Sequence, residues 1–238
     1  MLDSPIDIEK LKKLQFKVMQ DVAAAAVVPL MRIGDQLGLF KKLSELGEVS
    51  SQKFAEEAKV DERYLREWLH AISAAGFISY NKGNKTFSLS PEQTAVFAHE
   101  EGPANMIGAY DVLTGAIHNE KDVLEAFKTG AGVPYEDACP ICFQGTARFF
   151  KPSYQANLIK KWLPLIEGFE EKMKSGGSFA DIGCGHGLST LMIADAFPSG
   201  KVAGFDIHGP SIDQAKNLAK DANLLDQIEY GVADAKSY

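Results

Sequence analysis

The chain has 238 residues, of which 45% are hydrophobic and 24% are charged, a balance typical of folded proteins rather than of disordered ones. The formal net charge of −7 at pH 7 argues against a general binder of nucleic acids or of anionic membranes, so small molecules are the expected partners. The length allows one large domain or two smaller ones.

The N-terminal sequence and the cysteine content favour a cytoplasmic protein. Residues 1–7 contain neither the basic stretch nor the apolar stretch of an export signal. The longest apolar run, residues 22–31, is too short to span a bilayer. Three cysteines, an odd number, are typical of a reducing compartment.

A long helix is expected at the start of the chain, from Asp7 to about Val28. The apolar residues at helical spacing are Ile8, Leu11, Leu14, Val18 or Met19, Val22 and Ala26. The alanine-rich run at residues 23–26 would let a second helix approach closely. The helix should therefore pack in a core or against a partner, and we expect a homodimer through the N-terminal helices.

The residues after this helix predict a second helical segment. We expect Pro29 to open it and the segment to continue through Leu43. Gly34 and Gly38 lie within it, and because glycine is a poor helix former, their presence suggests close packing.

The next part of the chain follows the order helix, turn, helix, hairpin. A first helix is expected to begin near residue 50 or 51, and Asp61 should cap a second helix, RYLREWLHAISAAG, which ends at Gly76. Two alternating segments, residues 77–80 and 86–89, then flank a turn and predict a hairpin. This order is typical of a winged-helix domain, which we place in residues 1–95.

The predicted recognition helix of this domain carries no phosphate-binding face. Arg63 and Arg66 are balanced by three acidic residues, and the remaining positions are largely apolar. The acidic residues are Asp61, Glu62 and Glu67. We therefore interpret the domain as a dimerisation and capping module and expect no nucleic-acid partner.

Residues 96–175 are expected to form a helical connector, with segments near residues 102–117, 122–128 and 154–174. A connector between the winged helix and a following sheet would form a lid over a bound ligand. Its aromatic residues could line an acceptor pocket or belong to an ordinary core. They are Tyr110, Tyr135, Phe143, Phe149, Phe150, Tyr154 and Trp162.

Four residues of the connector region admit chemical roles. His118, and besides it His99, could act as a general base. Cys139 and Cys142 have the C-x-x-C spacing of a redox pair or of half a zinc site. Because the sequence holds no second such pair, we expect no metal.

Residues 179–190, FADIGCGHGLST, have the pattern of a strand, a glycine turn and a helix start. A short apolar run ends at Asp181, and Gly183, Gly185 and Gly187 follow at alternate positions. Because glycine has no Cβ, a ligand can lie directly on the backbone at the carboxyl edge of a parallel sheet. The alternative is that the glycines only make a tight corner.

The spacing separates this loop from two other nucleotide-binding loops. The chain contains no G-x-x-x-x-G-K-[ST] string, and a dinucleotide fingerprint needs its third glycine where Leu188 stands. The remaining pattern, Asp-x-Gly-x-Gly-x-Gly, resembles the first motif of the class I S-adenosylmethionine-dependent methyltransferases. In that family the loop passes beneath the amino-acid end of the cofactor, so the resemblance assigns Asp181 to the charged methionine moiety.

Two more acids end the next two predicted strands. Residues 201–207, KVAGFDI, contain Asp206, whose two oxygens could accept both ribose hydroxyls. Residues 228–233 precede Asp234, which the resemblance places at the adenine amino group. With their neighbours Ile207 and Ala235, these acids complete the expected cofactor site, although each acid could simply cap a helix.

The resemblance extends over most of the chain. Small-molecule O-methyltransferases use a similar winged-helix domain for dimerisation, and bacterial methyltransferases with such an N-terminus share the strings GLF (38–40), ERYLREWL (62–69) and GVPY (132–135). The resemblance implies a mainly α winged-helix domain followed by a Rossmann-like α/β domain in residues 176–238. It also implies in-line methyl transfer from S-adenosylmethionine to a small molecule, with no catalytic residue assigned, because orientation supplies much of the rate.

The expected sheet is smaller than that of the resembled catalytic domain. Residues 176–238 predict only about its first three strands, so roughly half of the sheet is expected to be absent, and we expect the 238 residues alone to show weak or no turnover. Two other functions stay open, a ligand-sensing transcriptional regulator and a noncatalytic scaffold that binds the same cofactor.

Overall fold

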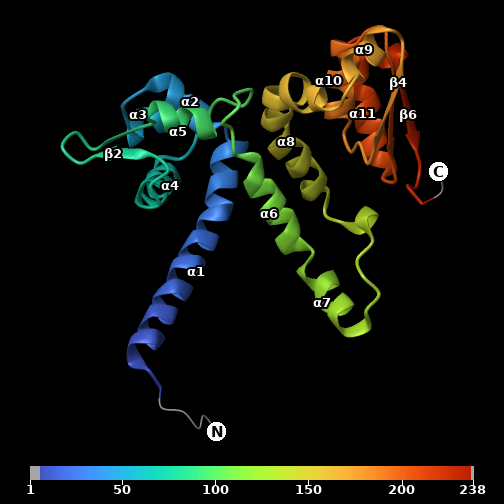
Figure 1. The fold of residues 1–238 in the computed structure, drawn as a ribbon. Helices are drawn as coiled ribbons and strands as arrows, with labels where there is room; N and C mark the ends of the chain where they lie inside the picture. The colour runs from blue at the N-terminus through green and yellow to red at the C-terminus, as the bar shows by residue number, and fades with distance from the viewer. Residues whose placement is uncertain (1–5, 237–238) are drawn as a thin grey trace. The chain divides into compact units, whose positions relative to one another are not determined.

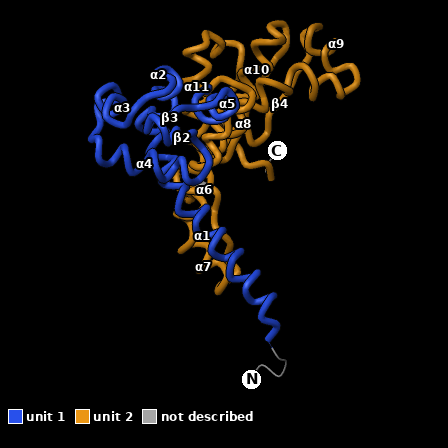
Figure 2. Tube along the Cα trace, turned by 90° about the vertical axis from the view of Figure 1, so that its left-hand side faces the viewer, with its two compact units in different colours: residues 1–99 blue, residues 100–238 orange. Residues whose placement is uncertain are grey.

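The computed structural model describes residues 6–236 and divides into two compact units, Met1–His99 and Glu100–Tyr238 (Figure 2). The connector expected at residues 96–175 therefore falls almost entirely in the same unit as the sheet that follows it. Residues 1–5, which contributed to the expectation of no export signal, lie outside the described residues.

Helix α1 (Ile8–Gln36) begins the first unit where the sequence predicts it, with Asp7 Oδ1 accepting a hydrogen bond from Lys10 N–H at 3.1 Å. The boundary expected at Pro29 is wrong, because Pro29 lies inside α1. The helix instead breaks before Gly38, whose φ of +65° is left-handed, and α2 (Leu39–Leu46) follows. A proline removes one helical hydrogen bond, whereas a left-handed residue turns the chain into a new direction.

The end of α1 packs closely on α4 (Glu62–Ala74). A Cβ on Gly34 would lie 2.3 Å from Trp68 Cζ2, which confirms close packing at this glycine. Trp68 Nε1 donates a hydrogen bond to the carbonyl of Leu30 at 2.8 Å. The same expectation is wrong for Gly38, since a Cβ there would meet nothing within 4 Å.

The other elements of the first unit confirm the winged-helix order. Asp61 caps α4 as predicted, with its Oδ1 accepting from Tyr64 N–H at 3.2 Å. A short strand that the sequence did not predict, β1, joins the hairpin in an antiparallel sheet of order β1-β3-β2. The remaining elements are β1 (Val49–Ser50), α3 (Ser51–Ala58), β2 (Ser79–Asn81), β3 (Thr86–Ser88) and α5 (Pro91–Phe97).

The core of this unit is built from the end of α1 and the helices that follow it. Its fully buried large side chains are Met31, Leu39, Phe40, Leu43, Phe54, Leu69 and Ile72.

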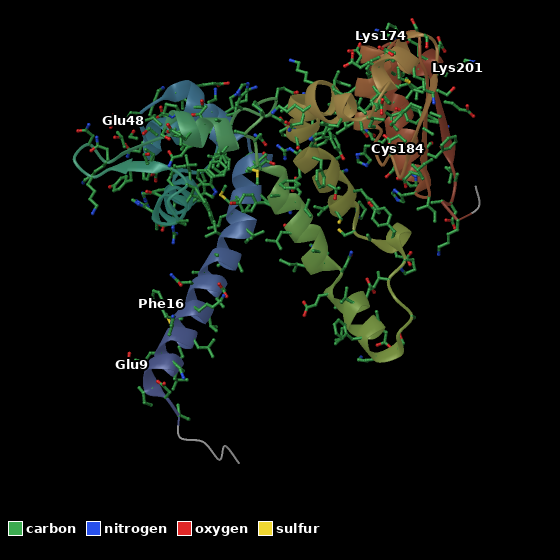
Figure 3. The ribbon with its side chains drawn as sticks, in the orientation of Figure 1. Glu9, Phe16, Glu48, Lys174, Cys184 and Lys201 are labelled. Atoms are coloured by element: carbon green, nitrogen blue, oxygen red, sulfur yellow. The ribbon has the colours of Figure 1, made fainter. Side chains whose placement is uncertain are left out.

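The first part of α1 contributes nothing to that core. Its exposed apolar side chains are Ile8, Leu11, Leu14, Phe16, Val18, Met19 and Val22, and Figure 3 labels Phe16 on this stretch. By length and composition α1 is also the one helix among residues 6–236 that could cross a membrane, with 11% of its most apolar window buried, a test that signal sequences and core helices of soluble proteins also pass. These side chains are therefore exposed in the described part of the first unit.

The second unit begins with a helical portion. Helices α6 (Gly108–His118) and α7 (Glu120–Thr129) match two predicted segments, but α8 (Pro140–Asn157) begins well before the predicted residue 154. Gly145 conceals this helix in the sequence because glycine is a poor helix former. In the structure it allows close contact with α6, since a Cβ there would lie 2.6 Å from Val112 N.

Irregular helical turns connect α8 to the sheet. A π-helical turn (Leu158–Trp162) and a 3-10 turn (Leu163–Leu165) lead into α9 (Phe169–Lys174). Their buried residues join the core of the second unit, which consists of Leu158, Leu163, Phe169, Met173, Ile193, Ala194, Phe197, Val202, Ala219 and Ile228.

A parallel sheet completes the second unit (Figure 1). Its strands, in the order β4-β5-β6, are β4 (Ser178–Ile182), β5 (Lys201–Asp206) and β6 (Ile228–Val232). Helices α10 (Leu188–Ala196) and α11 (Gly209–Asp221) connect them in turn, which confirms the predicted α/β architecture. Because the strands are parallel, their carboxyl ends all lie at one edge of the sheet.

Candidate functional site

The glycine loop lies between β4 and α10 and is attached to the end of β5. The N–H groups of Gly183 and Cys184 both donate to the carbonyl of Phe205, at 2.7 Å and 3.0 Å, and Cys184 is labelled in Figure 3. Gly183, Gly185 and Gly187 all have positive φ, of 78°, 54° and 71°.

The three glycines have different surroundings. A Cβ on Gly183 or Gly185 would meet nothing within 4 Å, and both residues line a cavity. A Cβ on Gly187 would lie 2.7 Å from Tyr230 Oη and 2.8 Å from Ala215 Cβ. Two of the glycines therefore leave room for a ligand, whereas Gly187 makes the loop fit against α11 and β6.

Asp206 lies at the end of β5, where its side chain is buried and organises the loop. Its Oδ2 accepts a hydrogen bond from Gly185 N–H at 2.8 Å, and its Oδ1 accepts one from His208 N–H at 2.9 Å. Each carboxylate oxygen has two lone pairs, so each keeps one position for a further donor. The side chain both holds the glycine loop and retains the capacity to accept two hydroxyl groups.

Asp181, in β4, is held by the first turn of α10. Its Oδ2 accepts hydrogen bonds from Ser189 Oγ at 2.7 Å and Thr190 Oγ1 at 2.8 Å. Its Oδ1 has no hydrogen-bond partner among residues 6–236, and Asp181 lines the cavity. One oxygen is therefore anchored and the other remains available to a ligand.

The cavity beside the loop encloses about 160 Å³, less than most small-molecule sites, and so would hold part of a nucleoside-sized ligand. Two carboxylates and no lysine or arginine line it. The lining residues are Tyr135, Phe143, Thr146, Ala147, Phe150, Tyr154, Asp181, Gly183, Cys184, Gly185, His186, Leu188, Ser189, Asp206 and Ser211. These charges favour a cationic ligand and disfavour a phosphate.

Aromatic side chains of the connector form one wall of the cavity. Tyr135, Phe143, Phe150 and Tyr154 line it, whereas three others from the predicted set do not. Those three are Tyr110, Phe149 and Trp162. Phe143 stacks on His208, with ring centroids 4.1 Å apart and an interplanar angle of 11°, so the connector is joined to the residues that follow β5.

Burial shifts the titration of three groups around the loop. It lowers the pKa of His186, with His208 adding to the effect, so this imidazole is neutral at pH 7. Burial, followed by the nearby Asp181 and Asp206, raises the pKa of the Cys184 thiol to about 12. Burial also raises the pKa of Tyr154. Cys184 is therefore a protonated thiol and not a nucleophile under ordinary conditions.

The other predicted cofactor residues lie at the same edge of the sheet but outside the cavity lining. Ile207 directly follows β5 and is 45% exposed. Asp234 and Ala235 follow β6, and Asp234 Oδ1 accepts from Lys236 N–H at 2.9 Å.

None of the candidate bases and metal ligands of the connector is among the described residues that line the cavity. His118 is at the end of α6, with its Nδ1 3.1 Å from the carbonyl of Thr114, and His99 belongs to the first unit. Within residues 6–236, no group of three or more His, Cys, Asp and Glu side chains could hold a metal ion.

Two polar residues of the site were not predicted from the sequence. Ser189 and Thr190 supply both hydrogen bonds to Asp181. The sequence feature that could have indicated them is a pair of hydroxyl residues at the helix start, soon after the glycine loop. Because such residues commonly serve as local caps, the pair alone does not indicate that they hold an acid of the preceding strand.

Two family models match the chain, one in each unit. Residues 23–99 match the Rv2258c-like winged HTH domain, and residues 179–238 match a methyltransferase domain. Over 59 residues, 25% of this chain, the sequence is 30% identical to trans-aconitate 2-methyltransferase of Streptomyces coelicolor. The chain spans 20% of the length of that relative.

Solved structures of methyltransferases share the fold along nearly the whole chain. The mitomycin 7-O-methyltransferase MmcR has a TM-score of 0.64 at 16% identity, covering 96% of this chain and 68% of its own. The structure of PigF with SAH has a TM-score of 0.62 at 16% sequence identity, and the match covers 96% of this chain and 67% of that chain. An O-methyltransferase family protein from Burkholderia thailandensis has a TM-score of 0.58 at 12% sequence identity, and the match covers 97% of this chain and 65% of that chain. The chain therefore contains a match to a winged HTH domain followed by a match to a methyltransferase domain, and it shares the fold of these solved structures.

Proposed function

We propose that the protein is an S-adenosylmethionine-dependent methyltransferase that acts on a small-molecule acceptor. The observation that carries this proposal is the cavity under the glycine loop, which two carboxylates line and which no lysine or arginine lines. S-adenosylmethionine carries two positive groups, a sulfonium and an ammonium, so such a lining favours it over a phosphate-bearing dinucleotide. The methyltransferase-domain match at residues 179–238 contains both carboxylates and the loop.

The residues present fit the parts of this cofactor. The Oδ1 atom of Asp181 can accept from the ammonium group, and the remaining lone pairs of Asp206 can accept from the ribose hydroxyls. Gly183 and Gly185 leave space above the loop backbone. We assign Asp234 to the adenine amino group, and we place Ile207 and Ala235, the neighbours of Asp206 and Asp234, in the same cofactor site.

When bound, the cofactor supplies an activated methyl group, and the chain's own contribution is orientation and shielding. The aromatic wall of Tyr135, Phe143, Phe150 and Tyr154 offers flat apolar surfaces to an acceptor. The neutral imidazole of His186 lines the same cavity and can receive a proton from an acceptor that carries one.

Two further properties belong to this proposal. The exposed apolar stripe of α1 supports a homodimer formed through the N-terminal helices, because burying such a surface is favourable. A cytoplasmic location agrees with the three free thiols among the described residues.

The charges on the helix that would read DNA count against the transcriptional regulator. Arg66, on the helix that would read DNA, is paired with Glu62 at 2.8 Å, so its charge is partly neutralised. The scaffold alternative shares the cofactor site and differs only in turnover.

Calorimetric titration with S-adenosylhomocysteine (SAH), the demethylated cofactor, tests the proposal. Binding is the chosen readout because the methyl acceptor is not identified. The intact chain should bind SAH, and Asp206→Asn should weaken binding by about tenfold or more, since an amide nitrogen cannot accept the hydrogen bonds that the carboxylate accepts.

Asp226→Asn is the matched control, because Asp226 is exposed and lies away from the cavity lining. This control should bind SAH as the parent chain does, and circular dichroism should show that both variants are folded. Absence of SAH binding to the folded parent chain, or equal affinity for Asp206→Asn, would overturn the proposal.

A further inference from the structure

The C-P-I-C segment at residues 139–142 has no part in the proposed function. Cys139 and Cys142 are free thiols that are partly exposed, whereas the third cysteine, Cys184, is buried. Half a zinc site needs further ligands, and the described part of the chain contains no group of three or more residues that could hold a metal. A C-x-x-C spacing is also that of a redox pair.

The first turn of α8 brings the two cysteines together. Cys139 precedes the helix with an extended backbone, at φ −54° and ψ 131°, and Pro140 is the first helical residue. Cys142 N–H donates to the carbonyl of Cys139 at 2.7 Å. A turn with this hydrogen bond holds its end Cα atoms within about 7 Å, and disulfides span Cα separations of about 4.4–6.8 Å.

Cys139 is the cap residue of α8, and Cys142 is the third residue of the helix. In a capping box, the side chains of these two residues each form a hydrogen bond with the backbone N–H of the other residue. Here neither thiol has that task. Cys139 makes no side-chain cap hydrogen bond, and its backbone N–H donates instead to Asn119 Oδ1 at 3.1 Å.

We propose that Cys139 and Cys142 are a redox site that forms a reversible intramolecular disulfide by exchange with a low-molecular-weight disulfide such as oxidised glutathione. One cysteine thiolate attacks a sulfur of the glutathione disulfide, forms a mixed disulfide and releases one glutathione thiolate. The second cysteine thiolate then attacks the cysteine sulfur of the mixed disulfide and releases the other. The pair loses two electrons and two protons in total, and glutathione disulfide is reduced to two thiols.

The disulfide would lie at the edge of the candidate site without cross-linking separate elements. Both cysteines belong to one helical turn, so the fold itself needs no rearrangement. Phe143, the next residue, lines the cavity and stacks on His208. The disulfide would therefore form or break directly beside the aromatic wall.

Equilibration with defined ratios of reduced and oxidised glutathione, followed by acid quenching, alkylation and peptide mass mapping, tests the proposal. The parent chain should lose alkylation at Cys139 and Cys142 together, with a linked 139–142 peptide and full recovery after reduction. Cys184 should become alkylated only after denaturation, because it is buried and its pKa is raised to about 12.

Three serine variants provide the controls. Cys139→Ser and Cys142→Ser should each stop at a mixed disulfide with glutathione on the remaining cysteine, whereas Cys184→Ser should form the internal disulfide as the parent does. Two results would overturn the proposal: glutathione adducts on both cysteines with no linked peptide, or thiols that remain fully alkylated in oxidised glutathione.

Discussion

Each compact unit contains a three-stranded sheet, but the two sheets treat polar side chains differently. In the first unit, Glu48 accepts hydrogen bonds from Asn81 and Thr86 at the exposed surface of the antiparallel sheet. In the second, the parallel strands carry Asp181 and Asp206 to one edge, where both line a cavity. Neighbouring antiparallel strands end at opposite edges, whereas parallel strands end at the same edge, so only the second sheet concentrates charge at one place.

Glycine is used for close packing in both units, but with different constraints. Gly34 has helical geometry and faces the Trp68 ring, whereas Gly187 combines a left-handed backbone with contacts to Tyr230 and Ala215. Substitution should therefore cost more at the loop than at the helix, and only the loop substitution should affect ligand binding.

The largest effect is expected for Gly187→Ala. A Cβ would lie 2.7 Å from Tyr230 Oη at a φ of +71°, so overpacking and backbone strain should together cost about 2–4 kcal/mol. Urea unfolding of the second unit measures this loss, and calorimetry should show that SAH binding is lost with it. Gly168→Ala is the control, because Gly168 has a similar φ of +69° but open space around it. Equal losses in the two variants would show that the contact with Tyr230 does not matter.

A smaller loss is expected for Gly34→Ala in the first unit. The new Cβ would lie 2.3 Å from Trp68 Cζ2 and 2.8 Å from Phe40 Cε2, so we expect a net loss of about 1–3 kcal/mol after the gain in helix propensity. Urea unfolding of the first unit measures it. SAH affinity should stay at the parent value, and a weakened affinity would contradict the separation of the two roles.

Local patterns predicted the parts of the molecule that consecutive residues determine. The glycine loop and the acids at positions 181 and 206 were recognisable because the strand, the turn and the helix start follow one another directly. Asp61 was predicted as a cap for the same reason, and its hydrogen bond to Tyr64 N–H confirms it.

Features that depend on contacts between distant segments were not predictable in this way. The start of α8 was missed because Gly145 weakens the helical pattern, and the contact with α6 that it permits involves residues far away in the sequence. Likewise, nothing in the sequence indicated that Phe143 would stack on His208. Pro29 misled the assignment of α1 because its single lost hydrogen bond is tolerated within a long helix.

Each unit contains an aromatic side chain with a polar donor, Trp68 in the first and Tyr230 in the second, and the two donors differ in their hydrogen bonding. Trp68 Nε1 donates to Leu30 O at 2.8 Å, so Trp68→Phe should lose this bond and part of the ring packing, a cost of about 1–2 kcal/mol. Urea unfolding of the first unit measures the loss. Leu65→Met is a suitable control, because it is a near-isosteric change in the same helix. If Trp68→Phe lost no more stability than Leu65→Met, the hydrogen bond would contribute nothing.

The smallest effect is expected for Tyr230→Phe, which should cause no loss of stability. Tyr230 Oη is buried and makes no hydrogen bond of ordinary geometry in the described part of the chain. Burial raises the pKa of this phenol above its ordinary value, and the nearby Thr190 side chain offsets only part of that rise. A buried hydroxyl without a partner has lost its hydrogen bonds to water, so removing it should leave stability unchanged or raise it by up to about 1 kcal/mol. Urea unfolding measures the change beside Trp68→Phe. SAH affinity should also stay within error of the parent value, because Tyr230 is not among the described residues that line the cavity. A loss of stability above about 1 kcal/mol would show instead that the hydroxyl is satisfied, for example by a buried water, and that the loop depends on it.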